Sequence, residues 1–142
     1  MPSAKTIDLL NELFAIENRS LPTYLADACP WTHPGDEPAS QALVHILADQ
    51  QQMVGRLGDL IDARGGRVDR GSFPMEYTDM NLLSLDFLVL ELIRCQKRDI
   101  ADIERIVPSF GADREARELA EEILGSERAH LEALEDLVKQ PS

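Results

Sequence analysis

Residues 119–138 read LAEEILGSERAHLEALEDLV, and this stretch decides the fold class. Its apolar side chains recur at spacings of three and four, at Leu119, Ile123, Leu124, Leu131, Leu134 and Val138. That period is typical of an amphipathic helix, and no strand-like alternation competes with it. Asp113 is a residue type that caps helices at their start. The pattern therefore predicts a helix from about Asp113 to Lys139.

The rest of the chain repeats this period in three further segments, which glycine and proline separate. We expect these helices over about Ser3–Ala28, over about Pro38–Arg64, and from a cap at Thr78 or Asp79 to just before Pro108. Pro22 should kink the first helix. Gly65 and Gly66 should end the second. All 142 residues then form a single all-α domain.

The connection between the second and third helices, about residues 65–78, is the longest of the three. Its roughly fourteen residues reach about 46 Å when extended. A helix of about 26 residues is only about 39 Å long. The connection can therefore return along the whole second helix, which predicts a four-helix bundle of two antiparallel helical hairpins joined by a long crossover. An unstructured loop between two ordinary hairpins is the alternative.

The charge balance of 26 acidic against 14 basic residues, a net charge of −12, limits the classes of partner. Nucleic acids and anionic membranes are bound through Lys and Arg, so we expect neither as a partner. Cys29 and Cys95 show no zinc-binding spacing and predict no disulfide, which favours a reducing compartment. No apolar run reaches transmembrane length. We therefore expect a cytoplasmic protein.

Acidic residues interrupt the apolar face of every expected helix. They are Glu17, Asp49, Glu91 and Glu127. An ionised carboxylate in an apolar interior costs several kcal/mol unless it is paired or bound to a metal. Arg56 or Arg94 can neutralise one or two of the four. Otherwise these acids must hold protons through raised pKa values, or they must hold cations.

The spacing of further polar residues favours cations. His130 follows Glu127 by three positions, and Gln52 follows Asp49 by three. An acid and a His at this spacing can both reach a metal between helices. Carboxylate and imidazole together suit iron or manganese. We therefore expect the metal ligands Glu17, Asp49, Gln52, Glu91, Glu127 and His130.

The chain resembles the bacterioferritin and rubrerythrin branch of the ferritin-like superfamily over all four expected helices. Residues 88–92, LVLEL, are similar to the third-helix ligand segment of that family, and residues 123–132, ILGSERAHLE, to its fourth-helix ExxH segment. The resemblance implies Glu17 and Glu91 as terminal ligands, Asp49 and Glu127 as bridging ligands, and Gln52 and His130 at the imidazole positions.

Two departures from the family pattern lie in the second helix. The family has ExxH where this chain reads Asp49-Gln50-Gln51-Gln52. His45, one turn earlier, can replace the missing imidazole or remain a solvated surface residue. Gln50 stands where the haem-ligating Met of the family would be, so we expect no haem.

The resemblance implies a metal-binding protein that holds one or two iron or manganese ions in a partly divergent di-iron-type site. Its enzymatic form would be ferroxidase-type oxidation of ferrous iron, or reduction of oxygen or peroxide. The alternative, which Asp49 and Gln52 favour, is a structural or interaction module with a degraded, metal-free site. We also expect at least a homodimer, because apolar residues widen the face of the second helix: Leu43, Val44, Leu47 and Val54.

Overall fold

The structure is a computed structural model that describes residues 4–28, 37–70, 73, 77 and 85–139. The helices in this part of the chain are α1 (Ala4–Asn18), α2 (Leu21–Ala28), α3 (Glu37–Ala63), α4 (Leu85–Ile106), the 3-10 helix η3 (Val107–Phe110) and α5 (Arg114–Lys139). No strand occurs among the described residues. The predicted all-α fold is confirmed. None of the described helices has the length and apolarity that a membrane crossing requires.

The first expected helix is in fact two helices, α1 and α2, so the prediction of one continuous, kinked helix is wrong. Pro22 explains the break, because it has no N–H to donate backwards and is tolerated only in the first turn of a helix. Ser20 caps the new helix. Its Oγ accepts a hydrogen bond from the N–H of Thr23 at 3.3 Å.

The predicted end of α3 and start of α5 agree with the structure. Gly65 has a φ of 75°, and the N–H of Gly66 donates to the carbonyl of Ile61 at 2.9 Å, as in a Schellman motif. Asp113 precedes α5, and its Oδ1 accepts from the N–H of Ala116 at 3.3 Å. The expected caps of α4, Thr78 and Asp79, lie outside the described residues.

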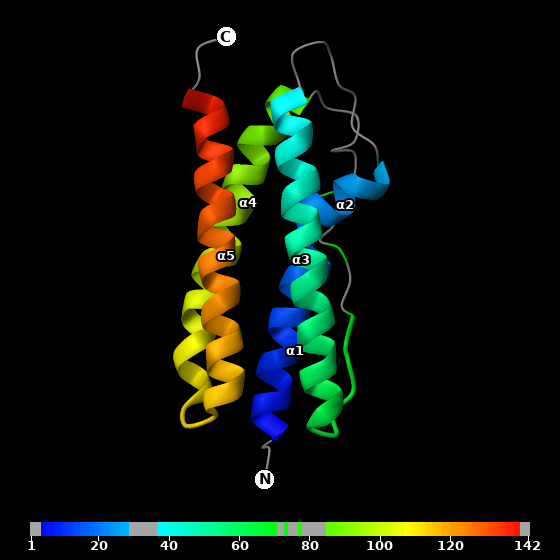
Figure 1. Cartoon of the computed structure of the whole chain (residues 1–142), viewed down its shortest axis with the longest axis vertical. Coiled ribbons are helices and arrows are strands. Elements are labelled where there is room, and N and C mark those ends of the chain that lie inside the picture. The colour runs from blue at the N-terminus through cyan, green and yellow to red at the C-terminus, as the bar shows by residue number, and fades with distance from the viewer. Residues whose placement is uncertain (1–3, 29–36, 71–72, 74–76, 78–84, 140–142) are drawn as a thin grey trace.

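The four long helices lie side by side along the long axis of the molecule (Figure 1). In this view α3 and α4 run from top to bottom, whereas α1 and α5 run from bottom to top. α1 packs against α3, α4 packs against α5, and α3 also contacts α5. η3 joins α4 to α5 at the lower end.

The segment after α3 follows α1 back along the molecule. Asn11 holds its beginning: Nδ2 donates to the carbonyl of Arg67 at 2.9 Å, and Oδ1 accepts from the N–H of Asp69 at 2.7 Å. Directly after the end of α1, Nε of Arg19 donates to the carbonyl of Arg70 at 2.9 Å. These contacts fix the path of residues 67–70.

Aromatic contacts hold the described residues further along this segment. The centre of the Phe73 ring lies 5.3 Å from the centre of the Tyr24 ring of α2. The Arg19 guanidinium lies 4.8 Å from the centre of the Phe73 ring. Tyr77 is buried, 5.6 Å from Tyr24, and its hydroxyl accepts from Arg98 of α4 at 3.4 Å. The segment therefore links α2 to α4.

Two apolar clusters fill the interior at different heights. The lower one contains Leu9, Leu10, Leu13 and Phe14 of α1, Leu57, Leu60 and Ile61 of α3, and Ile123 of α5. The upper one contains Leu21 of α2, Ile46 of α3, Leu92 of α4 and Leu134 of α5. Buried polar residues separate the two clusters along the helices, namely Glu17, Ser20, Gln50, Gln96, Asp99, Glu127 and His130. We call these seven residues the polar layer.

Candidate metal centre

Glu17, on the inner face of α1, is the residue of the polar layer whose side chain lacks hydrogen-bond partners. Its side chain is buried, and neither carboxylate oxygen has a hydrogen-bond partner among the described residues. Burial raises the pKa of Glu17 well above its usual value, and the negative charges of Glu127, Asp99 and Asp49 raise it further. Glu17 must therefore carry a proton or lie beside a cation.

Glu127 faces Glu17 from α5, and each of its oxygens has a partner. Oε1 lies 2.5 Å from Nδ1 of His130, one helical turn further on. Oε2 accepts from Nε2 of Gln50 at 3.1 Å. The carbonyl of Glu127 accepts from Gln96 of α4 at 3.0 Å. The partners of the Glu127 carboxylate are therefore His130 and Gln50, and neither oxygen of Glu17 is hydrogen-bonded to it.

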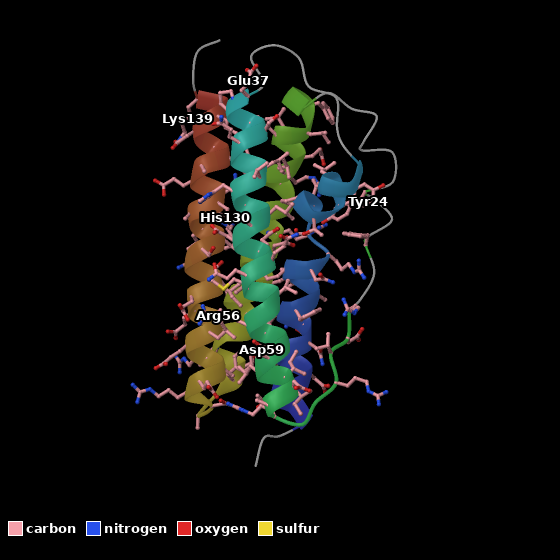
Figure 2. The ribbon with its side chains drawn as sticks, turned by 45° about the vertical axis from the view of Figure 1, so that its right-hand side comes forward. Tyr24, Glu37, Arg56, Asp59, His130 and Lys139 are labelled. Atoms are coloured by element: carbon pink, nitrogen blue, oxygen red, sulfur yellow. The ribbon has the colours of Figure 1, made fainter. Side chains whose placement is uncertain are left out.

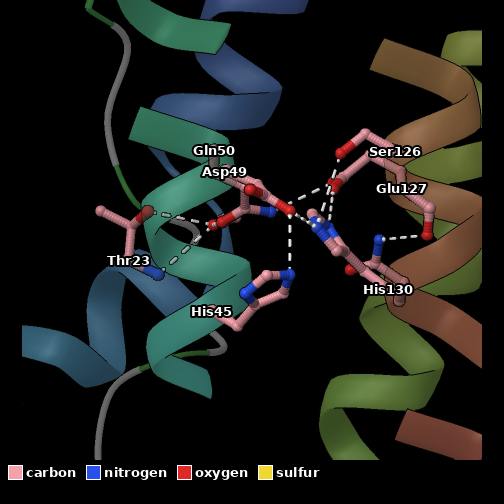
Figure 3. A network of polar contacts seen from close by, with 9 residues as sticks. Thr23, His45, Asp49, Gln50, Ser126, Glu127 and His130 are labelled. Carbon is pink, nitrogen blue, oxygen red and sulfur yellow. Dashed lines mark hydrogen bonds and ion pairs between the residues drawn. The ribbon is translucent and has the colours of Figure 1, made fainter. Parts of the chain in front are cut away.

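His130 joins two carboxylates, as Figure 3 shows. Its Nε2 lies 2.9 Å from Oδ2 of Asp49, on the side opposite to Glu127. Burial lowers the pKa of His130, but the hydrogen bonds to Glu127 and Asp49 outweigh burial, and the net pKa is raised. The imidazolium form suits this position because it donates from both ring nitrogens. The ring lies about halfway along the molecule, between α3 and α5 (Figure 2).

Asp49 connects this buried group to the surface. Its side chain is 36% exposed, and Nε2 of the exposed His45 lies 3.6 Å from Oδ2. His45, Asp49, His130 and Glu127 therefore form a continuous line of polar contacts from solvent to the interior (Figure 3).

The structure brings four of the six expected ligands together, namely Glu17, Asp49, Glu127 and His130. It does not bring Gln52 to them. Gln52 is exposed, because Gln50 faces inward and two helical positions correspond to a rotation of about 200°. The assignment of Gln52 as an inward ligand is therefore wrong.

Glu91 also lies apart from this group. Its Oε2 pairs with Nη2 of Arg94 at 3.0 Å, one turn along α4, and its side chain is 24% exposed. The inward face of α4 at this height carries Gln96 and Asp99 instead. Glu91 stands one position before the buried Leu92, so it is rotated by about 100° from the inward direction.

Sequence reasoning missed two buried residues, Gln50, which contacts Glu127, and Ser20, which contacts Gln50. Ser20 donates from its hydroxyl to Oε1 of Gln50 at 2.7 Å. The apolar spacing of α3 carried a signal for Gln50, since it follows the buried Ile46 by four positions and precedes the buried Leu57 by seven. Ser20 gave a weaker signal, a capping residue type just before Pro22.

Glu17, Glu127 and His130 are the residues of this centre that could hold a metal ion. As the side chains stand, no three His, Cys, Asp or Glu residues in the described part of the chain form a ready metal-binding group. A cation between Glu17 and Glu127 would, however, relieve the unpartnered carboxylate and replace the proton that Glu127 shares with His130. Oxygen and nitrogen donors of this kind suit iron or manganese. The expected two-metal ligand set is incomplete, because Glu91 and Gln52 lie elsewhere.

No protein-family model matches the chain, and neither a curated protein nor a solved structure is significantly similar to it. Its function is therefore inferred from its own residues and their arrangement.

Proposed function

We propose that this protein is a ferritin-like four-helix bundle that binds one divalent metal ion, iron or manganese, between Glu17, Glu127 and His130. The observation that carries the proposal is the unpartnered carboxylate of Glu17, buried next to a second carboxylate and an imidazole. The opposite directions of α3 and α5, and the segment that returns along α1, support the ferritin-like arrangement of two hairpins and a crossover.

Charge favours a cation in this position. The group holds three carboxylates, Glu17, Asp49 and Glu127, and one imidazole, so a protonated His130 neutralises only one of them. A divalent ion beside Glu17 and Glu127 neutralises two negative charges in a part of the interior where water is scarce. The ion displaces the protons of Glu17 and His130, so its binding should release protons.

The test is the metal content of the protein and its response to added metal. Protein from iron- and manganese-supplemented cells should contain one ion per chain by elemental analysis. Metal-free protein should gain about 2.7 kcal/mol of stability at a free metal concentration of 100 times Kd. Titration calorimetry in buffers of different ionisation enthalpy should detect the released protons.

Matched variants locate the ion. Glu17→Gln keeps the shape of the side chain and should abolish the stabilisation by metal. Glu12→Gln makes the same change on the exposed side of α1, where the carboxylate is 49% exposed, and should preserve it. Equal stabilisation of both variants would place the ion elsewhere on the protein.

A metal-free structural or interaction module is the second candidate, and a specific observation favours it. Both oxygens of Glu127 already have partners, Gln50 and His130, and a protonated Glu17 needs no cation. This candidate predicts no metal after purification and no change of stability with iron or manganese. If metal does bind, oxygen consumption with ferrous iron tests the enzymatic form of the proposal.

We propose in addition that the chain forms a homodimer through α3. Val44 on this helix is 69% exposed, the highest value among the exposed large apolar residues of the described chain. Leu43 packs against the upper apolar cluster and Val54 against the lower one. These two residues therefore contribute less to a dimer surface on α3 than the sequence analysis predicted. Light scattering at micromolar concentrations distinguishes a dimer from a monomer.

A further inference from the structure

Gln50 is a buried amide at the centre of the polar layer, and its orientation is fixed from both ends. It is 1% exposed. Its Oε1 accepts from the hydroxyl of Ser20 at 2.7 Å, and its Nε2 donates to Oε2 of Glu127 at 3.1 Å. The amide therefore joins the start of α2 to the middle of α5 through α3.

The N-terminal cap of α2 determines which end of the amide faces Glu127. Oγ of Ser20 accepts from the backbone N–H of Thr23 at 3.3 Å, as a capping residue does. Its hydroxyl proton is then free to point at Oε1 of Gln50. The NH₂ group of Gln50 consequently faces Glu127, and this orientation also avoids contact between two oxygen acceptors.

This NH₂ group is hydrogen-bonded to one of the two carboxylate oxygens through which Glu127 can bind cations. The imidazole of His130 lies at Oε1, and the amide of Gln50 lies at Oε2. A carboxylate that bridges two metal ions uses one oxygen for each ion. We propose that Gln50 limits the centre to one metal ion, because its amide N–H takes the position at Oε2 of Glu127 where a second ion would bind. This inference rests on the proposed metal-binding function.

The charge of the site leads to the same stoichiometry. One divalent ion neutralises two of the three carboxylates Glu17, Asp49 and Glu127. A second ion would leave the group positively charged, and the neutral amide of Gln50 supplies no counter-charge. A carboxylate of the same shape at position 50 would supply it and would offer an oxygen in place of the N–H donor.

The substitution Gln50→Glu tests this inference, with Gln52→Glu as the matched control. The control adds the same charge to the same helix at an exposed position. Both variants and the wild type are freed of metal and titrated with Mn²⁺, and the bound ions per chain are counted by calorimetry and elemental analysis. Gln50→Glu should bind one ion more than the wild type, and Gln52→Glu should bind the same number as the wild type.

Electron paramagnetic resonance shows where the additional ion binds. Two Mn²⁺ ions that share Glu127 lie about 3.5–4 Å apart, so their signals should be spin-coupled. A coupled signal in Gln50→Glu supports the inference, and an additional ion with an uncoupled signal overturns it. An unchanged number of ions in Gln50→Glu also overturns it.

The outcomes separate this inference from the proposed function. One ion in both the wild type and Gln50→Glu overturns the role of Gln50 and preserves the metal site. No ion in the wild type overturns the proposed function, and the inference about Gln50, which rests on that function, falls with it. If Gln50→Glu unfolds without metal, refolding on addition of Mn²⁺ supports the inference, and failure to refold counts against it.

Discussion

Replacement of Glu17 by Gln should make the metal-free protein more stable at neutral pH, although it removes an acid that the fold has buried. The pKa of Glu17 is raised in the folded state, whereas in the unfolded chain it returns to its ordinary value of 4.5. Between these two values the folded protein holds one proton more than the unfolded chain. The free energy of unfolding therefore falls as pH rises through this interval.

The size of the effect follows from this linkage. The stabilisation from the protonated Glu17 is fully present below pH 4.5 and is lost as pH rises to the folded pKa, at about 1.4 kcal/mol per pH unit. The amide that Glu17→Gln introduces does not titrate, so the variant lacks this loss. For a chain of this length the melting temperatures of wild type and variant should diverge by roughly 4 °C per pH unit.

The assay is urea unfolding followed by circular dichroism from pH 4 to 8, with a chelator present and the ionic strength held constant. Glu12→Gln on the exposed side of α1 is the control, and its stability should run parallel to that of the wild type. A constant difference between Glu17→Gln and the wild type from pH 5 to 8 would refute the reasoning. It would mean that Glu17 is ionised and paired throughout this range.

Three further changes have defined outcomes. NMR titration of the metal-free protein should give His130 a midpoint above its ordinary 6.5, since its pKa is raised, and the stability it contributes should be lost as pH rises through that midpoint. Glu127→Gln should lower the midpoint. Gly65→Ala should cost about 1–2 kcal/mol in thermal unfolding because Gly65 has a φ of 75°. Asp113→Ala should lower the free energy of unfolding by about 2–4 kcal/mol. It removes the cap of α5 and the charged hydrogen bonds from Arg64, whose Nη2 lies 2.9 Å from Oδ1 of Asp113.

Local signals made the helices and most of their ends predictable. The pair Gly65-Gly66 ends α3, and Asp113 caps α5, because each acts through hydrogen bonds to residues a few positions away. The break between α1 and α2 was not predictable in the same way. Pro22 is compatible both with a kink inside one helix and with the first turn of another, and only the cap at Ser20 decides between them.

Which polar residues point into the interior was predictable only where the apolar face of the helix is narrow. Glu127 and His130 lie between apolar residues that occupy a single stripe of α5, so their direction follows from the sequence. The second and third expected helices have apolar residues over a wider arc. The inward position was therefore uncertain by one or two residues, and each residue is about 100° of rotation. Gln52 lies two positions after the buried Gln50, and Glu91 lies one position before the buried Leu92, so both were wrongly placed in the centre.

The polar layer divides the interior into two separate apolar compartments, and this division affects how the native protein opens. Each compartment buries its own side chains, so one end of the molecule can lose its packing while the other end keeps it. The upper end includes α2, a helix of only eight residues. Its amides, with those of the adjoining turns of α3 and α5, should exchange with deuterium sooner than the amides around Leu13 and Ile61. A metal ion bound at Glu17 would tie the two ends together and bring their exchange rates closer.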